Sequence, residues 1–104
     1  MEFITAEELS KAKKEYLLVD IRGERRSIPQ RIEGSIIVDV YDDIHFGRLE
    51  IAKEKLSALP KDRTIVLICN SGSTTKPASI ILESMGYKTK ILENGMIGWN
   101  AAKI

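Results

Sequence analysis

The chain has 104 residues, 43% of them hydrophobic and 30% charged, which is typical of a single soluble globular domain over residues 1–104. Sixteen Lys and Arg balance fifteen Asp and Glu, so the charge gives no reason to expect nucleic acid or an anionic membrane surface as a partner. No apolar run approaches the roughly 20 residues that span a bilayer, and residues 1–8 lack the basic-then-apolar pattern of a signal peptide.

Five short apolar segments predict β-strands. The middle ones consist almost entirely of Val, Ile and Leu, instead of alternating apolar and polar residues. This is the pattern of strands that are buried on both faces, as in a parallel sheet covered by helices. The predicted strands are Phe3–Ile4, Tyr16–Ile21, Ile36–Val40, Ile65–Ile68 and Thr89–Leu92.

Helical patterns lie between these strands. Thr5 opens a capping-box sequence, which predicts a helix start. Residues 49–59 carry leucine and alanine at helical spacing, and Pro60 ends that segment. A third apolar stripe covers residues 78–85 and ends at Gly86, a typical residue just after a helix. The alternation predicts an α/β fold with a mainly parallel five-stranded sheet flanked by helices.

The only cysteine, Cys69, directly follows the fourth predicted strand. It therefore lies at the carboxyl end of a strand, which is where ligands bind in parallel α/β sheets. Residues 70–75 (Asn-Ser-Gly-Ser-Thr-Thr) are small and polar, so their backbone N–H groups can turn inward as an anion nest. The following helix adds positive charge from its N-terminus. We therefore predict a loop that holds a thiolate or a small oxyanion. The alternative is a buried cysteine that packs as a small apolar residue.

Two further features of this segment bear on the loop. Pro77 suits the first turn of a helix and disfavours helical geometry at Lys76, which we therefore expect at or before the helix cap. Lys76 either folds over the loop mouth as a cation or is a solvated surface lysine. A single cysteine cannot form an internal disulfide, which favours a reducing, cytoplasmic setting.

Four segments resemble the rhodanese domain. Residues 69–75 resemble its active-site loop, Cys-Arg-x-Gly-x-Arg-Ser/Thr, and residues 18–22 (Leu-Val-Asp-Ile-Arg) resemble its Asp-x-Arg strand end. Residues 31–36 (Arg-Ile-Glu-Gly-Ser-Ile) resemble its His-Ile-Pro-Gly-Ala-Ile stretch. Residues 92–99 (Leu-Glu-Asn-Gly-Met-Ile-Gly-Trp) resemble its closing Leu-x-Gly-Gly-hydrophobic-x-x-Trp. The resemblance covers nearly the whole chain, and the size is similar to that of the single-domain rhodaneses.

The resemblance implies a rhodanese-like sheet and a sulfurtransferase reaction. A cysteine thiolate takes sulfane sulfur from thiosulfate or another persulfide donor, and a thiol acceptor, which can belong to a protein, removes it. The implied nucleophile is Cys69, and Asp20 and Arg22 are implied structural supports. The implied substrate-binding residues are Asn70, Ser71, Gly72, Ser73, Thr74, Thr75 and Lys76. No cofactor is implied, and a chain with one histidine and one cysteine gives little basis for a metal site.

The chain departs from the family pattern at both loop arginines, which are replaced by Asn70 and Thr74. These cations would stabilise the thiolate and bind anionic thiosulfate, so we expect weak activity with thiosulfate. The family's histidine and proline before Gly34 are also replaced, by Arg31 and Glu33, in what we interpret as a turn.

Other notable residues are given structural interpretations. We expect Gly95 and Gly98 to be turn residues and Trp99 to pack in the core. The Asp42–Asp43 pair is interpreted as a solvated turn. The only histidine, His45, has no sequence feature that connects it to the cysteine, so it is a weak candidate for a general base.

Three further functions compete with the sulfurtransferase. The first is a catalytically weak or inactive rhodanese-like module that binds a protein, which the missing arginines favour and the retained cysteine disfavours. The second is a cysteine-dependent phosphatase or arsenate reductase, but no arginine follows Cys69 to clamp an oxyanion. The third, a nucleotide P-loop, lacks the required Gly-x-x-x-x-Gly-Lys-Ser/Thr spacing.

Overall fold

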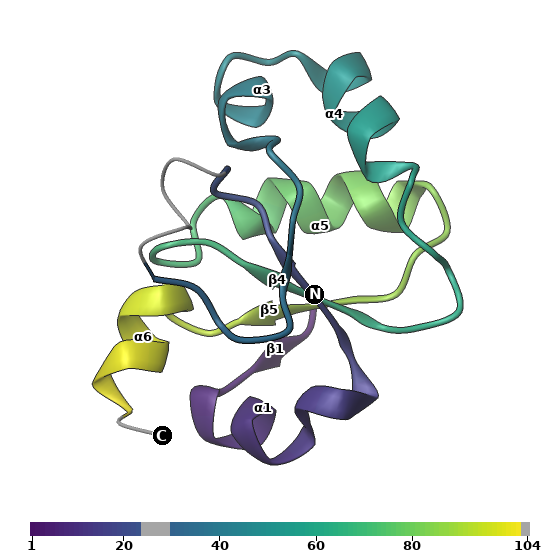
Figure 1. Ribbon diagram of the computed structural model, residues 1–104. Helices are drawn as coiled ribbons and strands as arrows, with labels where there is room; N and C mark the ends of the chain where they lie inside the picture. Colours follow the sequence, from purple (N-terminus) through teal and green to yellow (C-terminus); the bar gives the residue numbers. More distant parts are fainter. Residues whose placement is uncertain (24–29, 103–104) are drawn as a thin grey trace.

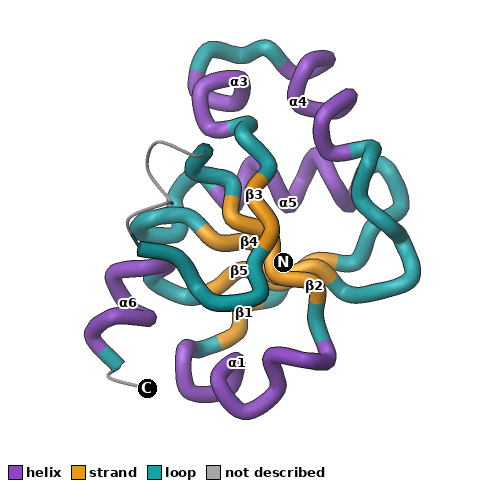
Figure 2. The backbone as a smooth tube through the Cα atoms, in the orientation of Figure 1, coloured by secondary structure: helices purple, strands orange, loops and turns teal. Residues whose placement is uncertain are grey.

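The computed structural model describes residues 1–23 and 30–102. All strand pairs in these residues are parallel and form one five-stranded sheet in the order β1-β5-β4-β2-β3 (Figure 2). The parallel α/β architecture is therefore confirmed. The strands are β1 (Phe3–Ile4), β2 (Leu17–Asp20), β3 (Ile36–Ile37), β4 (Ile65–Ile68) and β5 (Thr89–Leu92).

Helices cover both faces of this sheet. In Figure 1, α1 and α6 lie on one side of the strands, and α3, α4 and α5 lie on the other. In the described residues, none of these helices is long and apolar enough to cross a membrane. Their bounds are α1 (Ala6–Ala12), the 3-10 turn η1 (Lys13–Glu15), α3 (Tyr41–His45), α4 (Leu49–Leu56), α5 (Thr75–Ser84) and α6 (Gly95–Ala101).

The central strand β4 supplies both halves of the core. Ile65 and Leu67 point into the apolar cluster that includes residues of α4 and α5, whereas Val66 and Ile68 point into the cluster that includes residues of α1 and α6. All four side chains are fully buried. This alternation explains why the strand is continuously apolar, and it directs Cys69, the next residue, toward the α5 side of the sheet.

The first helix begins as its sequence predicts. The Thr5 hydroxyl accepts a hydrogen bond from the Glu8 N–H at 3.1 Å, and the Glu8 carboxylate accepts one from the Thr5 N–H at 3.0 Å. The capping box is thus complete. Ile4 and Leu9, on either side of it, pack in the same buried cluster.

The third strand is shorter than predicted, and the helix after it was missed. Only Ile36–Ile37 pair as a strand, because the chain leaves the sheet after Ile37 and forms helix α3 from Tyr41. The prediction of a solvated turn at Asp42–Asp43 is wrong for Asp43, which is buried. Its carboxylate binds Arg48 Nε at 3.1 Å and Lys55 Nζ at 2.7 Å. These contacts with α4 and the turn before it hold the five-residue helix, and local sequence does not reveal them.

The prediction that Lys76 lies at or before the helix cap is also wrong. Helix α5 begins at Thr75, so Lys76 lies in its first turn together with Pro77. Proline is tolerated there because the first N–H groups of a helix have no partner within it. The helix ends as predicted, since Gly86 follows it with φ +92°.

The closing motif forms a helix instead of the predicted turn. Gly95 and Gly98 both lie in α6, where their missing side chains permit close backbone packing. Trp99 packs against the buried cluster on the α1 side but stays partly exposed, so it lies at the edge of the core instead of inside it.

Candidate active site

Cys69 lies at the carboxyl end of β4, and its side chain is only 1% exposed. Its Sγ accepts a hydrogen bond from the Gly72 N–H at 3.0 Å. Gly72 has φ +97°, a conformation that glycine adopts without steric cost. Thr75 Oγ1 donates to the Gly72 carbonyl at 2.9 Å and lies 3.8 Å from Sγ, close enough to accept a weak hydrogen bond from the thiol. The loop therefore curls around the sulfur.

Helix α6 supports this loop from below. The Met96 N–H donates to the Cys69 carbonyl at 2.8 Å, and the Ile97 N–H donates to the Asn70 carbonyl at 3.0 Å. Gly95 permits this contact, because a Cβ atom there would lie 2.3 Å from the Cys69 oxygen. The closing motif of the chain thus fixes the backbone on both sides of the Cys69–Asn70 peptide bond. The sequence alone does not reveal this role of α6, although two glycines three positions apart are a signal of close backbone packing.

Asp20 and Arg22 form a buried ion pair beside the loop. Arg22 Nη2 lies 2.8 Å from Asp20 Oδ2, and the two side chains are 4% and 0% exposed. Arg22 Nη2 also donates to the Gln30 carbonyl, and its Nη1 donates to Asn70 Oδ1 at 3.2 Å. The pair therefore connects the end of β2 to the first residue after the cysteine.

Thr74 contacts a residue that the sequence did not connect to this site. His45 Nε2 lies 3.1 Å from Thr74 Oγ1, within hydrogen-bonding distance. The imidazole packs against the Tyr41 ring, with the ring centres 4.4 Å apart. Because the contact joins positions 29 residues apart, local motifs could not predict it.

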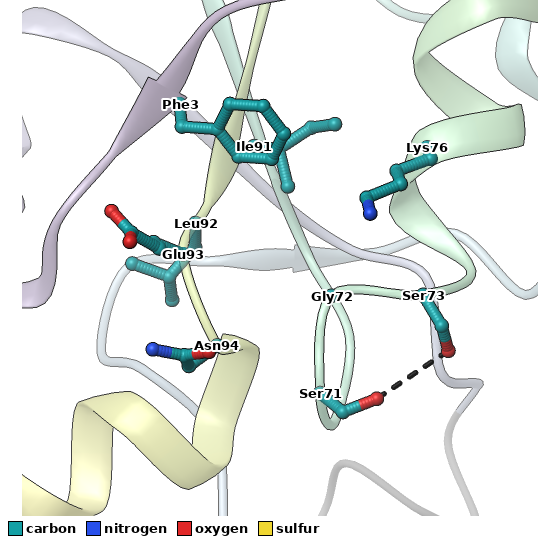
Figure 3. A pocket seen from close by; sticks show the side chains of 9 residues that line it. All are labelled: Phe3, Ser71, Gly72, Ser73, Lys76, Ile91, Leu92, Glu93 and Asn94. Atoms are coloured by element: carbon teal, nitrogen blue, oxygen red, sulfur yellow. Dashed lines mark hydrogen bonds between the residues drawn. The ribbon is translucent and has the colours of Figure 1, made fainter.

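A cavity of about 450 Å³ lies on one side of the loop (Figure 3). Ser71, Gly72 and Ser73 line it on the loop side, and the two serine hydroxyls lie 3.4 Å apart. The amino group of Lys76 points into it, and Phe3 of β1 lines its far side together with residues of β5. Lys76 thus lies in the first turn of α5 beside the loop, as an exposed side chain that lines the cavity.

The structure brings the predicted site residues 69–76 together with Asp20 and Arg22 at the carboxyl ends of the neighbouring strands β2 and β4. Among the described residues, no group of three or more His, Cys, Asp or Glu side chains is arranged to hold a metal ion. What the arrangement can do chemically is hold a negatively charged sulfur against a backbone amide at the start of a helix.

Comparison with known proteins decides the family. A model of the rhodanese-like domain matches residues 5–102. The chain belongs to the rhodanese-like domain family. It is 33% identical over 88 residues to YtwF of Bacillus subtilis, which carries a sulfurtransferase name, covering 85% of this chain and 77% of that protein. It is 31% identical over 87 residues to a sulfurtransferase of Allochromatium vinosum, covering 83% of this chain and 73% of that protein.

Solved structures agree on the rhodanese-like fold. The crystal structure of a rhodanese-related protein from Thermoplasma volcanium superimposes with a TM-score of 0.83, covering 98% of this chain and 93% of that one. The identity of that pair is 24%, so the similarity concerns the fold. The two relatives named as sulfurtransferases, at 33% and 31% identity, support a sulfurtransferase-like enzyme.

Proposed function

We propose that this rhodanese-like protein forms a persulfide on Cys69 and transfers the sulfur to a thiol. The Cys69 thiolate attacks the sulfane sulfur of a donor, a new S–S bond forms, and the donor's own bond to that sulfur breaks. The donor's remainder, sulfite from thiosulfate or a thiolate from a persulfide, leaves with the electron pair. An acceptor thiolate then attacks the outer sulfur, and the Cys69 thiolate leaves.

One contact carries the proposal: the hydrogen bond of 3.0 Å from the Gly72 N–H to Cys69 Sγ. A donor aimed at a sulfur atom favours its thiolate form, and so does the N-terminus of the ten-residue helix α5 immediately after the loop. A cysteine that only filled space would need neither feature. The same amide would stabilise the charge that returns to this sulfur in the second step.

The charges of the loop favour one class of sulfur donor over another. Asn70 and Thr74 are neutral where the family pattern has arginine, and of the residues from 70 to 76 only Lys76 is charged. Thiosulfate carries two negative charges, so it depends strongly on cationic groups. A persulfide on a protein or a small thiol carries one charge and brings further binding surface. We therefore favour a persulfide over thiosulfate as the donor, in a reducing, cytoplasmic setting.

Intact-protein mass spectrometry tests the proposal directly. The protein is incubated with thiosulfate, or separately with glutathione persulfide, and Cys69→Ser is treated in parallel. We expect the mass of one sulfur atom to be added to the wild type alone, more completely with the persulfide, and to be removed by cyanide. A protein that gains no sulfur from either donor, and whose cysteine reacts with alkylating agents as an ordinary thiol does, would instead be a binding module on a rhodanese-like scaffold.

A further inference from the structure

Both loop positions that lack the family's arginine are contacted by a basic side chain from elsewhere in the fold. Arg22, just after β2, donates from Nη1 to Asn70 Oδ1 at 3.2 Å. His45, at the end of α3, places Nε2 3.1 Å from Thr74 Oγ1. Two independent segments thus approach the two positions where the loop has lost a cation.

The contact from Arg22 fixes the orientation of Asn70. A guanidinium group has only hydrogen-bond donors, so the amide oxygen of Asn70 must face it. The amide nitrogen, with its two N–H groups, must therefore face away from Arg22. Arg22 itself is held by its buried ion pair with Asp20, which also compensates its positive charge. Arg22 consequently acts on the loop through the orientation of Asn70 more than through its own charge.

The contact from His45 can orient Thr74 in the same way. The Thr74 side chain is 3% exposed, so its hydroxyl has few alternatives to a protein partner. When Nε2 carries a proton, it donates to Thr74 Oγ1, and the hydroxyl proton is then free for another acceptor. The Tyr41 ring packs against the imidazole, and the Asp43 ion pairs hold the helix that carries it.

We propose that Arg22 and His45 are positioning residues that hold the cysteine loop at the two positions without arginine. Through Asn70 and Thr74 they fix the loop so that its Gly72 N–H stays on Cys69 Sγ. The inference rests on the proposed function and specifies its substrate class. A neutral donor such as a backbone N–H stabilises one negative charge by hydrogen bonding. It supplies no positive charge to balance a second negative charge on the substrate. Lys76 is the only charged side chain among residues 70–76, so the site is selective for a persulfide, whose reacting group carries one negative charge, over thiosulfate, which carries two.

The test uses variants at His45 and Thr74. His45→Leu removes the hydrogen bond, whereas His45→Gln keeps an N–H donor near the position of Nε2. Thr74→Val removes the hydroxyl and Thr74→Ser keeps it. Phe46→Leu, at the neighbouring side chain that is 72% exposed, serves as the matched control on the same segment. The readouts are the rate of Cys69 alkylation by iodoacetamide, and kcat and KM with glutathione persulfide and with thiosulfate.

We expect His45→Leu and Thr74→Val each to lower the alkylation rate and the kcat with glutathione persulfide by about tenfold or more. The double variant should lose no more than either single one, because both substitutions break the same contact between His45 and Thr74. His45→Gln, Thr74→Ser and Phe46→Leu should stay within about threefold of wild type. The kcat/KM of the wild type should be at least about a hundredfold higher for glutathione persulfide than for thiosulfate.

Three results would overturn the inference: unchanged rates in folded His45→Leu, a folded His45→Gln as slow as His45→Leu, or additive losses in the double variant. A thermal melt of each variant identifies any that are unfolded. If His45→Leu or Thr74→Val is unfolded, the rates of His45→Gln and Thr74→Ser decide whether the inference holds. Failure of the proposed function is a separate outcome. If neither donor loads wild-type Cys69, sulfur transfer is excluded, and the alkylation series still shows whether His45 acts on the thiol through Thr74.

Discussion

Gly95 packs against the carbonyl group of Cys69 so closely that no side chain fits between them. A Cβ atom on Gly95 would lie 2.3 Å from the Cys69 oxygen and 2.6 Å from the Asn70 oxygen. Its φ of +53° is also in the left-handed region, which disfavours residues with side chains. The start of α6 and the backbone that carries the thiol therefore form one rigid contact.

Replacing Gly95 by alanine should separate α6 from the loop. The new methyl group meets backbone atoms that cannot rotate away, so the bonds from the Met96 and Ile97 N–H groups to the loop should break. We expect a loss of about 3 kcal/mol or more in the free energy of unfolding, equivalent to a fall in Tm of more than about 10 °C. Sulfur loading of Cys69, measured by mass spectrometry below the lowered Tm, should also fall.

Gly47→Ala is the matched control for this substitution. Gly47 has φ +72°, but no atom lies within 4 Å of the position of its Cβ. Alanine there carries only the conformational cost, about 1 kcal/mol, and should leave sulfur loading unchanged. Equal losses of stability in the two variants would show that the close approach of α6 is not what holds the loop.

The parts of the fold that sequence predicts are those determined by local patterns. The strands Ile65–Ile68 and Thr89–Leu92 have the predicted bounds, because each is a short segment with apolar residues that lies between a turn or loop and the next predicted helix or motif. The capping box at Thr5 also formed as predicted, since its two partners are three residues apart. The location of the cysteine loop follows in turn, because it lies between a strand and a helix that are both recognisable.

The parts that sequence could not predict depend on distant partners. Helix α3 has five residues and is held by Asp43 binding Lys55, a contact across twelve positions. Helix α6 contains two glycines, which disfavour a helix when judged from sequence alone, and the packing of the Cys69 backbone against Gly95 is a contact between distant positions. The contact of His45 with Thr74 depends on α3 being a helix, so missing the helix also hid this residue of the site.

Gly72→Ala should affect the sulfur more than the fold. The new methyl group would meet the Asn94 nitrogen at 3.7 Å and the Leu92 oxygen at 3.9 Å, which are ordinary contact distances. The cost to stability is therefore limited to φ +97°, about 1 to 2 kcal/mol, but relaxation of this angle moves the N–H away from Cys69 Sγ. Persulfide formation should slow by about a hundredfold.

A comparison with Gly34→Ala isolates this effect. Gly34 has a similar φ of +88° and nothing within 4 Å of its Cβ position. The two alanine variants should melt at similar temperatures, while only Gly72→Ala slows the loading of Cys69 from glutathione persulfide, followed by quenched mass spectrometry. If Gly72→Ala loads at the wild-type rate, the Gly72 amide does not stabilise the thiolate.

Thr75 should tolerate serine but not valine. Its hydroxyl donates to the Gly72 carbonyl at 2.9 Å. This bond holds the peptide unit that follows the Gly72 N–H, the group that binds Cys69 Sγ. Valine has the same shape but leaves that carbonyl without its buried partner, whereas serine keeps the bond. We expect Thr75→Val to lower kcat about tenfold and the free energy of unfolding by about 1 to 2 kcal/mol. Thr75→Ser should stay close to wild type in both, as steady-state kinetics and urea denaturation would test.

The ion pairs of Asp43 should make stability depend on pH. The hydrogen bond from Lys55, and secondly that from Arg48, hold the pKa of the Asp43 carboxyl below its ordinary value, although burial acts in the opposite direction. The folded state therefore favours the ionised carboxylate more strongly than the unfolded chain does. This stabilisation is fully present above the pKa of an unfolded aspartate, about 3.9, and is lost as the pH falls through the lower folded value.

Asp43→Asn should consequently destabilise the protein at neutral pH and have little effect in acid. At about pH 7 we expect a loss of about 1 kcal/mol, or roughly 4–8 °C in Tm, because both partners of Asp43 are half-exposed and their bonds are partly screened. As the pH falls through the lowered pKa of the folded Asp43 carboxyl, the wild type loses this charge as well, and the two Tm values should converge. Asp62→Asn, at an exposed aspartate, controls for the change in net charge. A Tm difference that stays constant as the pH falls would mean that Asp43 holds α3 by its shape and not by its charge.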